Sequence, residues 1–204
     1  MKKKKIAVLI SNGGTGTNLQ AIIDGIEAKQ IFAQISVVIS DTLDAYGLQR
    51  AKKHRVATYV LKTKDNLAKL LKYKYFVDYI ALAGWKKIIS DEMITTFPNR
   101  ILNLHPGLIP DTYDGKVVNP DGTLGLWNRG KFTDSAIINF LNQKATYAGS
   151  TIHFLTSKFD FGPVLGRCFE KTIPGDSVET LYSRLKIKEN ALYADVLKKL
   201  CQSL

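Results

Sequence analysis

The chain has 204 residues, of which 45% are hydrophobic, and its formal net charge is +11 at pH 7. This length suits one globular domain with a real core, and no apolar run approaches the roughly 20 residues that a membrane span requires. The first residues lack the apolar stretch of a signal peptide, and two cysteines make no disulfide framework or metal-ligand pattern. We therefore expect a cytoplasmic protein without a metal.

The excess of positive charge favours phosphorylated or other anionic partners. Its lysines are spread over several predicted helices instead of gathering in one arm, and no nucleic-acid motif accompanies them. Charge alone also carries no sequence recognition. We expect a basic surface that steers small anionic substrates, and we expect neither a nucleic-acid nor a membrane partner.

Residues 5–11 are a near-continuous apolar run, which predicts a strand covered on both faces. The loop 12–18 contains three glycines, and helical periodicity begins at Leu19. A strand, a glycine-rich turn and a helix direct backbone N–H groups and a positive helix end toward an anion, and either Thr17 or Asn18 is predicted to cap the helix. The loop is neither a Walker motif nor a full dinucleotide fingerprint, so the alternative is a plain tight turn.

Strands continue to alternate with helices through the first hundred residues, which predicts a Rossmann-like, doubly wound and mostly parallel sheet with right-handed crossovers. Further strands are predicted at 35–40, 57–61, 76–83 and 101–104, and helices at 45–54, 65–71 and 90–97, the last one capped by Ser90.

The second half of the chain begins with an irregular loop, 111–131, which is rich in Gly, Asp and Asn. Loops of this length in a compact domain are usually lids or binding loops. A short helix over 133–141 follows, and strands over 148–156 and 164–169 predict an antiparallel hairpin that extends the sheet. Apolar residues at helical spacing predict a long C-terminal helix over 177–200 that closes the fold.

Asn103 and His105 stand at the end of a predicted strand, on the same side because side chains alternate with period two. Pro106 cannot continue a central ladder, which places the pair at the carboxyl end of the strand, where ligands bind in open α/β sheets. The alternative is a buried polar pair that only satisfies the backbone of the loop.

The chain has three histidines, and His105 is the best candidate for general acid–base chemistry. His54 lies in a solvated basic helix end, and His153 lies mid-strand, where it could face either side. Asp160, in a turn that follows an apolar strand, is the candidate carboxylate partner of His105. The alternative for Asp160 is an ordinary turn aspartate.

These segments together resemble one family. The matching segments include the glycine loop with 18–22, residues 40–48 and 82–85, Asn-Leu-His-Pro-Gly-Leu-Ile-Pro at 103–110, residues 149–154, and Asp-Phe-Gly-Pro-Val at 160–164. They are similar, in the same order, to the folate-dependent formyltransferases, and in particular to the phosphoribosylglycinamide (glycinamide ribonucleotide) formyltransferases.

The resemblance implies a single formyltransferase domain over 1–204, with a Rossmann-like nucleotide-binding half, 1–105, and a folate-binding and catalytic half, 106–204. It implies transfer of a formyl group from the co-substrate formyltetrahydrofolate to the amine of glycinamide ribonucleotide in purine biosynthesis, by a monomer or homodimer that needs no metal.

The resemblance also implies the site residues. Asn103, His105 and Asp160 would be catalytic: Asn103 and a protonated His105 would donate to a developing oxyanion, and Asp160 would keep His105 charged and draw a proton from the attacking amine. The phosphate of the nucleotide would lie on Gly14, Thr15, Gly16, Thr17 and Asn18, and the rest of the ribonucleotide on Lys186 and Glu189. Glu189 would be a partner for the substrate's ammonium, although Lys186 and Glu189 also fit plain surface positions. The folate would lie on Trp85, Lys86, Lys87, Ile88 and Ile89, together with Asn103 and Asp160.

The chain departs from the family pattern around the substrate pockets. The glycine loop is longer than usual, Lys87 stands where the family has arginine, and the loop 111–131 replaces the family's Tyr-Pro-Gly-x-His segment. Two alternatives therefore stay open, namely another amine acceptor, such as an amino sugar nucleotide, and a non-catalytic nucleotide-binding module. A methionyl-tRNA formyltransferase or a formyltetrahydrofolate hydrolase would carry a further domain, for which 204 residues leave no room.

Overall fold

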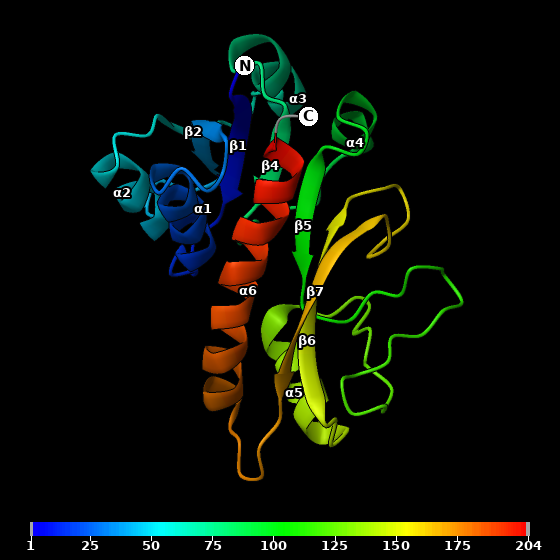
Figure 1. Ribbon diagram of the computed structural model, residues 1–204. Helices are drawn as coiled ribbons and strands as arrows, with labels where there is room; N and C mark the ends of the chain where they lie inside the picture. Colours follow the sequence, from blue (N-terminus) through cyan, green and yellow to red (C-terminus); the bar gives the residue numbers. More distant parts are fainter. Residues whose placement is uncertain (1, 203–204) are drawn as a thin grey trace. The chain divides into compact units, whose positions relative to one another are not determined.

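The computed structural model describes residues 2–202 and contains a seven-stranded sheet with the strand order β3-β2-β1-β4-β5-β6-β7 (Figure 1). The strands are β1 Lys4–Ile10, β2 Ala33–Ser40, β3 Thr58–Val60, β4 Tyr79–Leu82, β5 Ile101–His105, β6 Tyr147–Phe154 and β7 Val164–Lys171. The helices are α1 Thr17–Glu27, α2 Tyr46–Lys53, α3 Leu67–Lys69, the π-helical turn η1 Leu70–Lys74, α4 Asp91–Thr96, α5 Thr133–Asn142 and α6 Val178–Cys201. The mostly parallel sheet and the long last helix confirm the predicted α/β class.

The chain divides into two compact units. Unit 1 runs to Leu102 and also includes the chain from Tyr193 onward, and unit 2 is Asn103–Leu192. The boundary falls inside β5, so the two halves of this one strand belong to different units.

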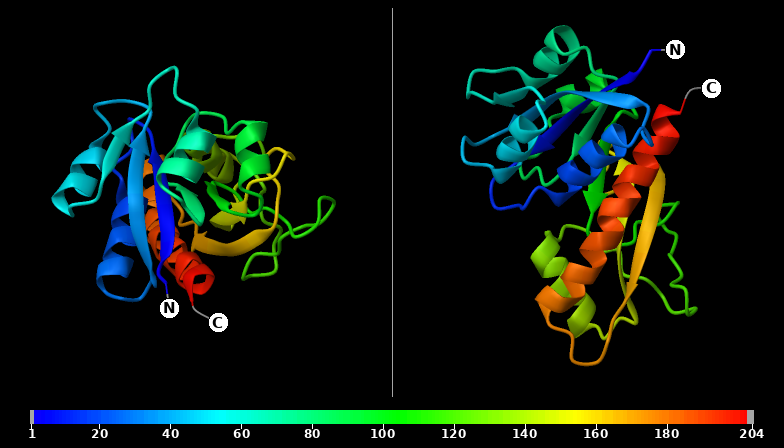
Figure 2. Two further views of the ribbon diagram at one scale, coloured as in Figure 1. Left: turned by 90° about the horizontal axis from the view of Figure 1, so that it is seen from above. Right: turned by 60° about the vertical axis from the view of Figure 1, so that its left-hand side comes forward.

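Parallel strands form the centre of unit 1. β1 pairs with β2 on one side and with β4 on the other, and both views of Figure 2 show β1 and β2 running side by side. Residues 6–10 of β1 are all buried. A strand without a polar face must be covered on both sides, which is what crossover helices do in a parallel sheet. The apolar run read from the sequence therefore marks the most central strand of this unit.

Helix α1 packs through Leu19, Ile22 and Ile23, whose spacing places them on one face of the helix. In the part of α6 that belongs to unit 1, Tyr193 is fully buried, and its hydroxyl donates to the carbonyl of Leu82 at 2.8 Å. Burial raises the pKa of this hydroxyl, which therefore stays a neutral donor.

Two predicted elements of unit 1 differ from the structure. The strand expected over 76–83 is β4, which begins at Tyr79, because Phe76 has a left-handed backbone (φ 52°) and Asp78 accepts the backbone N–H of Lys5. The helix expected over 65–71 begins at Leu67 and continues as η1. The cap of α4 is confirmed, since the Ser90 hydroxyl accepts from the N–H of Met93.

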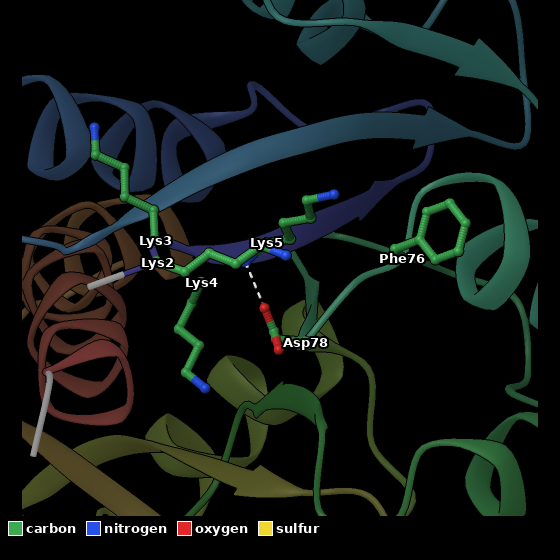
Figure 3. A pocket seen from close by; sticks show the side chains of 6 residues that line it. All are labelled: Lys2, Lys3, Lys4, Lys5, Phe76 and Asp78. Atoms are coloured by element: carbon green, nitrogen blue, oxygen red, sulfur yellow. Dashed lines mark hydrogen bonds between the residues drawn. The ribbon is translucent and has the colours of Figure 1, made fainter.

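The amino end of β1 borders a small hollow in unit 1 that is lined by Phe76, Asp78 and a run of lysines (Figure 3). Lys5 places its ammonium 5.6 Å from the centre of the Phe76 ring, a cation–π distance. This hollow lies at the opposite end of β1 from the glycine-rich loop, so it is not part of the site that the sequence predicts.

The predicted antiparallel hairpin of unit 2 is confirmed. β6 pairs with β7 from Tyr147 opposite Lys171 to His153 opposite Val164, with a register shift between Ile152 and His153. The core of unit 2 packs side chains from α5, from both strands and from the first half of α6. Its fully enclosed members are Ile137, Phe140, Ala148, Leu181 and Leu185.

The loop 111–131 lacks a helix or an extended strand, as predicted, and contains one isolated bridge between Val118 and Leu124. It is the long irregular green segment of Figures 1 and 2. Within residues 2–202, no helix combines the length and the apolar character that a membrane crossing demands.

Candidate active site

The glycine loop of unit 1 ends at Gly16, which is the N-cap of α1 and has a left-handed backbone (φ 70°). A β-carbon at Gly16 would lie 3.3 Å from the backbone of Gly47, so only glycine fits this turn easily. Arg50 donates to the carbonyl of Thr15 at 2.8 Å and thereby fixes the loop from outside. The result is an exposed loop that leads directly into a helix N-terminus.

The predicted caps of α1 are wrong, because Thr17 and Asn18 are helical residues and no side chain caps the helix. The Thr17 hydroxyl and the Asn18 amide oxygen are instead buried without any hydrogen-bond partner. Buried polar atoms are normally paired, so two unpaired ones beside uncapped N–H groups indicate a place for a polar ligand. This observation favours anion binding over a plain turn.

The segment 85–89 also lies in unit 1. The N–H of Lys86 donates to the Ser11 hydroxyl at 3.0 Å, and a β-carbon at Gly13 would lie 2.8 Å from the Lys86 ammonium. The structure thus brings Lys86, expected at the folate, to the glycine loop. Lys87 instead lies 4.0 Å from the carboxylate of Asp41.

A hollow of about 330 Å³ borders the other residues of this segment. Its lining includes Trp85, Lys87, Ile88 and Ile89, and also Lys64 and the acidic residues Asp65 and Glu92. Ile88 is 93% exposed, and the indole N–H of Trp85 is buried without a partner. An apolar wall with an unpaired donor and charged side chains of both signs can contact a flat, partly polar molecule.

His105 and Asp160 come together in unit 2. The carboxylate of Asp160 lies 3.6 Å from Nδ1 of His105, and His105 is only 2% exposed. Nε2 of His105 lies 2.7 Å from the carbonyl oxygen of Trp127. Because a carbonyl only accepts, Nε2 must carry a hydrogen, and Nδ1 is the position at which a proton can come and go.

Asp160 is held in turn by the same loop. Its carboxylate accepts the N–H of Gly130 at 2.7 Å, and its carbonyl accepts the indole N–H of Trp127 at 3.0 Å. Its backbone is left-handed (φ 48°), which is uncommon for a residue other than glycine. These two hydrogen bonds hold both the carboxylate and the backbone of Asp160 in place, unlike those of an ordinary exposed turn aspartate.

The expectation that Asp160 keeps His105 charged is wrong for the protein without substrate. Burial lowers the pKa of His105 below the ordinary histidine value, and the charge of Asp160 and the Trp127 carbonyl only partly oppose this effect. His105 is therefore predominantly neutral near pH 7, ready to accept a proton at Nδ1.

His153, which the sequence left able to face either side, is completely buried beside Asn103. Its Nδ1 lies 3.1 Å from the carbonyl of Phe154, so Nδ1 carries the hydrogen, and Nε2 accepts from the Asn103 amide nitrogen at 3.2 Å. Burial lowers the pKa of His153 to about 4, and the charge of His105 acts in the same direction. A neutral His153 thus fixes which end of the Asn103 amide faces it.

This burial predicts a pH-dependent stability. The unfolded chain binds a proton at His153 once the pH falls below 6.5, whereas the folded protein does so only near pH 4. The unfolded state therefore holds more protons in this window, and unfolding becomes easier by up to about 3 kcal/mol as the pH falls through it. Urea denaturation measures the free energy of unfolding of the wild type and of His153→Gln at pH 7 and at pH 4.5. The variant should lose less stability than the wild type; equal losses would contradict the prediction.

Lys186 and Glu189 lie together on α6 in unit 2. Glu189 is 2% exposed, and it accepts from the Ser150 hydroxyl at 2.7 Å and from the Lys186 ammonium at 3.2 Å. Burial disfavours the charged form of Lys186, but Glu189 and Tyr182 raise its pKa above the ordinary value. The pair is not a plain surface pair, and the charge of Glu189 is already matched by Lys186.

The structure thus joins the predicted residues in separate groups within each unit. In unit 1, Lys86 contacts the glycine loop; in unit 2, His105 and Asp160 form one group, Asn103 joins His153, and Lys186 joins Glu189. Sequence reasoning missed the backbone groups of Trp127 and Gly130. Their only sequence signal was the segment Trp-Asn-Arg-Gly, which suggested an aromatic face and a cation. Among residues 2–202, no group of three or more potential ligands is arranged to hold a metal.

The fold and these groups define a Rossmann-like α/β protein with candidate ligand-binding and proton-transfer residues at the ends of its strands. A family model described as "Formyl transferase" matches residues 4–197 and so spans both units. The chain belongs to the formyl transferase family.

The name phosphoribosylglycinamide formyltransferase recurs among the similar proteins. The phosphoribosylglycinamide formyltransferase of Haemophilus influenzae is 34% identical over 96% of this chain and 86% of its own length. The chloroplastic protein of that name from Arabidopsis thaliana is 31% identical over 98% of this chain, which spans only 66% of that protein. A crystal structure of glycinamide ribonucleotide transformylase 1 from Symbiobacterium toebii is 34% identical, with a TM-score of 0.81 over 96% of this chain and 86% of that one. The prediction of a folate-dependent formyltransferase is confirmed.

Proposed function

We propose that this chain transfers a formyl group from formyltetrahydrofolate to the amine of glycinamide ribonucleotide, a step of purine biosynthesis, and that Asn103, His105 and Asp160 are its catalytic residues. The observation that carries the proposal is the buried imidazole of His105, held between the Trp127 carbonyl and the Asp160 carboxylate. The names of the relatives that cover most of the chain agree with it.

The first step forms a bond between the amine nitrogen and the formyl carbon, and the carbonyl electron pair moves to the oxygen. The amide of Asn103, oriented by His153, donates to this oxygen. A positioned donor of this kind contributes about 3 kcal/mol in comparable sites, because it is stronger toward the developing charge than toward the ground state.

The second step breaks the bond between the formyl carbon and the folate nitrogen. The amine loses one proton to Asp160, Asp160 passes this proton to Nδ1 of the neutral His105, and Nδ1 delivers it to the folate nitrogen. As the bond to the folate nitrogen breaks, the electron pair of the oxyanion re-forms the formyl C=O. The lowered pKa of His105 suits this role, because the protonated ring is then a stronger acid and gives its proton more readily to the leaving nitrogen. The reaction needs no covalent enzyme intermediate.

The glycine loop binds the phosphate of the acceptor. The uncapped N–H groups of α1 and the free Thr17 hydroxyl supply donors, and rotation of the Asn18 amide by 180° adds another. Gly14, Thr15 and Gly16 let the backbone approach closely. Lys86 adds a cation near Gly13 that the sequence had assigned to the folate.

The hollow beside the segment 85–89 holds the folate in this proposal. Trp85 offers its free indole N–H, Ile88 and Ile89 offer apolar contact, and Lys87 offers a cation. Lys186 and Glu189 contact the ribonucleotide as an ion pair. Since Lys186 already matches the charge of Glu189, we assign Glu189 to polar groups of the ribonucleotide, in place of its expected role as the sole counter-ion of an ammonium.

An acceptor panel tests the function. Purified protein is supplied with formyltetrahydrofolate and with glycinamide ribonucleotide, an amino sugar nucleotide or a simple amine, and release of tetrahydrofolate is followed by absorbance. We expect turnover with glycinamide ribonucleotide. Turnover restricted to an amino sugar nucleotide would move the assignment to another acceptor, and nucleotide binding without any turnover would replace it by a binding module.

The remaining features of the proposal concern the setting of the enzyme. We place it in the cytoplasm as a monomer or homodimer that acts on small molecules, a phosphorylated amine and a reduced folate. The net charge of +11 supports anionic substrates of this kind, because a basic surface attracts them before they bind.

A further inference from the structure

The residues 126–130 form a strap that contacts both His105 and Asp160. The carbonyl of Trp127 accepts from Nε2 of His105 at 2.7 Å, and the N–H of Gly130 donates to the Asp160 carboxylate at 2.7 Å. Both contacts use backbone atoms, so the side chains of Trp127 and Gly130 do not create them. The strap itself is held by the N–H of Leu108, which donates to the carbonyl of Leu126 at 2.9 Å, by the Trp127 indole, and by one further buried side chain.

Asn128, which lies between these two residues, is buried to all but 6%. Its amide nitrogen donates to the carbonyl of Pro106 at 3.1 Å and to that of Ala136 at 3.3 Å, and its amide oxygen accepts from Asn139 at 2.7 Å. One side chain therefore ties the strap to the residue after His105 and to helix α5. Every polar atom of the amide has a partner.

The backbone of Asn128 is also unusual, because its φ angle is +56°. Asparagine is among the few residues that adopt this left-handed conformation at low cost. The turn at Asn128 reverses the chain so that the carbonyl before it and the N–H two residues later can reach the same pair of side chains. Asparagine therefore suits position 128 for two independent reasons: its amide makes all three hydrogen bonds, and its backbone tolerates a positive φ angle.

Gly107 packs directly against the carbonyl group of Trp127 in the strap. A β-carbon at Gly107 would overlap the carbonyl group of Trp127 and lie 2.9 Å from Nε2 of His105. The Trp127 carbonyl is therefore confined between Gly107 and the anchored Asn128.

We propose that Asn128 is a positioning residue for formyl transfer: it locks the strap so that the Trp127 carbonyl keeps the hydrogen of His105 on Nε2 and the Gly130 N–H keeps Asp160 opposite Nδ1. This inference rests on the proposed function. Without the lock, His105 can carry its hydrogen on either nitrogen, and the pair no longer passes a proton in one direction.

Three variants separate the contributions of Asn128. Asn128→Gly keeps the left-handed backbone and removes the amide, Asn128→Asp keeps the shape but turns a carboxylate toward two carbonyl oxygens, and Asn128→Ala removes both the amide and the backbone preference. Asn99→Gly is the matched control, because Asn99 is an exposed asparagine with φ 53°. We expect the control to keep the wild-type rate.

The first readout is kinetic. We expect kcat of Asn128→Gly to fall about 10- to 100-fold, with the KM values for both substrates within about twofold, since misplacing a catalytic group affects the transition state more than binding. Asn128→Asp should lose at least as much. Wild-type protein that turns over no acceptor would contradict the proposed function; active wild type with an equally active Asn128→Gly would overturn this inference alone.

The second readout does not depend on activity. ¹⁵N-edited NMR of the histidine rings reports which nitrogen of His105 carries the hydrogen, and His105→Gln assigns its signal. We expect Nε2–H in the wild type and a mixture of both forms in Asn128→Gly. An unchanged Nε2–H form in Asn128→Gly would overturn the inference, even if the rate fell.

Gly107→Ala provides an independent route to the same defect, because its methyl group displaces the Trp127 carbonyl from the other side. We expect the same change in the NMR signal of His105. We also expect kcat of the double variant Gly107→Ala/Asn128→Gly to be no lower than kcat of the slower single variant. Thermal melting checks that each variant is folded. Independent, multiplicative losses in a folded double variant would show that the two residues do not act on one carbonyl.

Discussion

Replacing His105 with alanine is expected to abolish turnover while leaving the phosphate of the nucleotide bound. The loss of kcat should reach at least about 10³-fold, because the substitution removes the group that carries the proton to the leaving nitrogen. In the proposed site, the phosphate contacts come from the glycine loop of unit 1, whereas His105 belongs to unit 2. Steady-state kinetics and calorimetric titration with the nucleotide measure the two effects separately.

His54→Ala is the matched control for His105→Ala. His54 lies on unit 1, where its ring contacts the carboxylate of Glu27 at 2.8 Å and the amide of Gln20. We expect its rate to stay within about twofold of the wild type, as is usual for surface contacts. If His105→Ala weakened nucleotide binding as much as turnover, His105 would have a structural role and the proposed chemistry would fail.

Asp160→Asn is expected to lower kcat by about 10²- to 10³-fold, because an amide cannot accept the proton of the attacking amine. Asparagine can still accept the N–H of Gly130 and tolerates the left-handed backbone of this position, so the substitution removes the charge and little else. Loss of this charge also removes an effect that raises the pKa of His105. The pH at which His105 loses its proton should therefore shift downward in the pH–rate profile.

The control for this prediction is Asp134→Asn, which removes an exposed carboxylate in the first turn of α5. Its kcat and pH–rate profile should match those of the wild type. A wild-type rate and an unshifted pH–rate profile in Asp160→Asn would show that Asp160 is an ordinary turn aspartate.

The sequence predicted those parts of the fold where one local signal dominates. The apolar run of β1 and the cap of α4 at Ser90 were read correctly, because burial on two faces and capping each leave a direct pattern in the sequence. The start of β4 was predicted too early, since Phe76 and Val77 have high β-propensity but a left-handed turn at Phe76 overrides it. The π-helical turn η1 has no such signature and was missed.

At the candidate site too, the sequence predicted only those residues that have a recognisable local pattern. His105, Asp160 and Asn103 were found because residue type and strand position indicate their chemistry, and the family resemblance then assigned their roles. The direction of the pKa shift of His105 was wrong, because sequence shows the nearby acid but not the depth of burial. The strap was missed because it acts through backbone atoms of Trp127 and Gly130, which any sequence would supply.

The loop 111–131 consists of two parts that differ in how they are held. In the tip, Asn119 and Thr123 pair through their backbones, Gly122 donates to the carbonyl of Asn119, and the Thr123 hydroxyl lies 2.6 Å from that of Thr146. The strap is instead anchored through Asn128. For protein engineering, this division separates two tasks within one continuous loop: the exposed turn 120–122 is the place to insert shorter or longer segments, and 126–130 is the part to keep unchanged. Sequence change in the exposed turn and preservation of the contacts to His105 and Asp160 can therefore proceed a few residues apart in this family member.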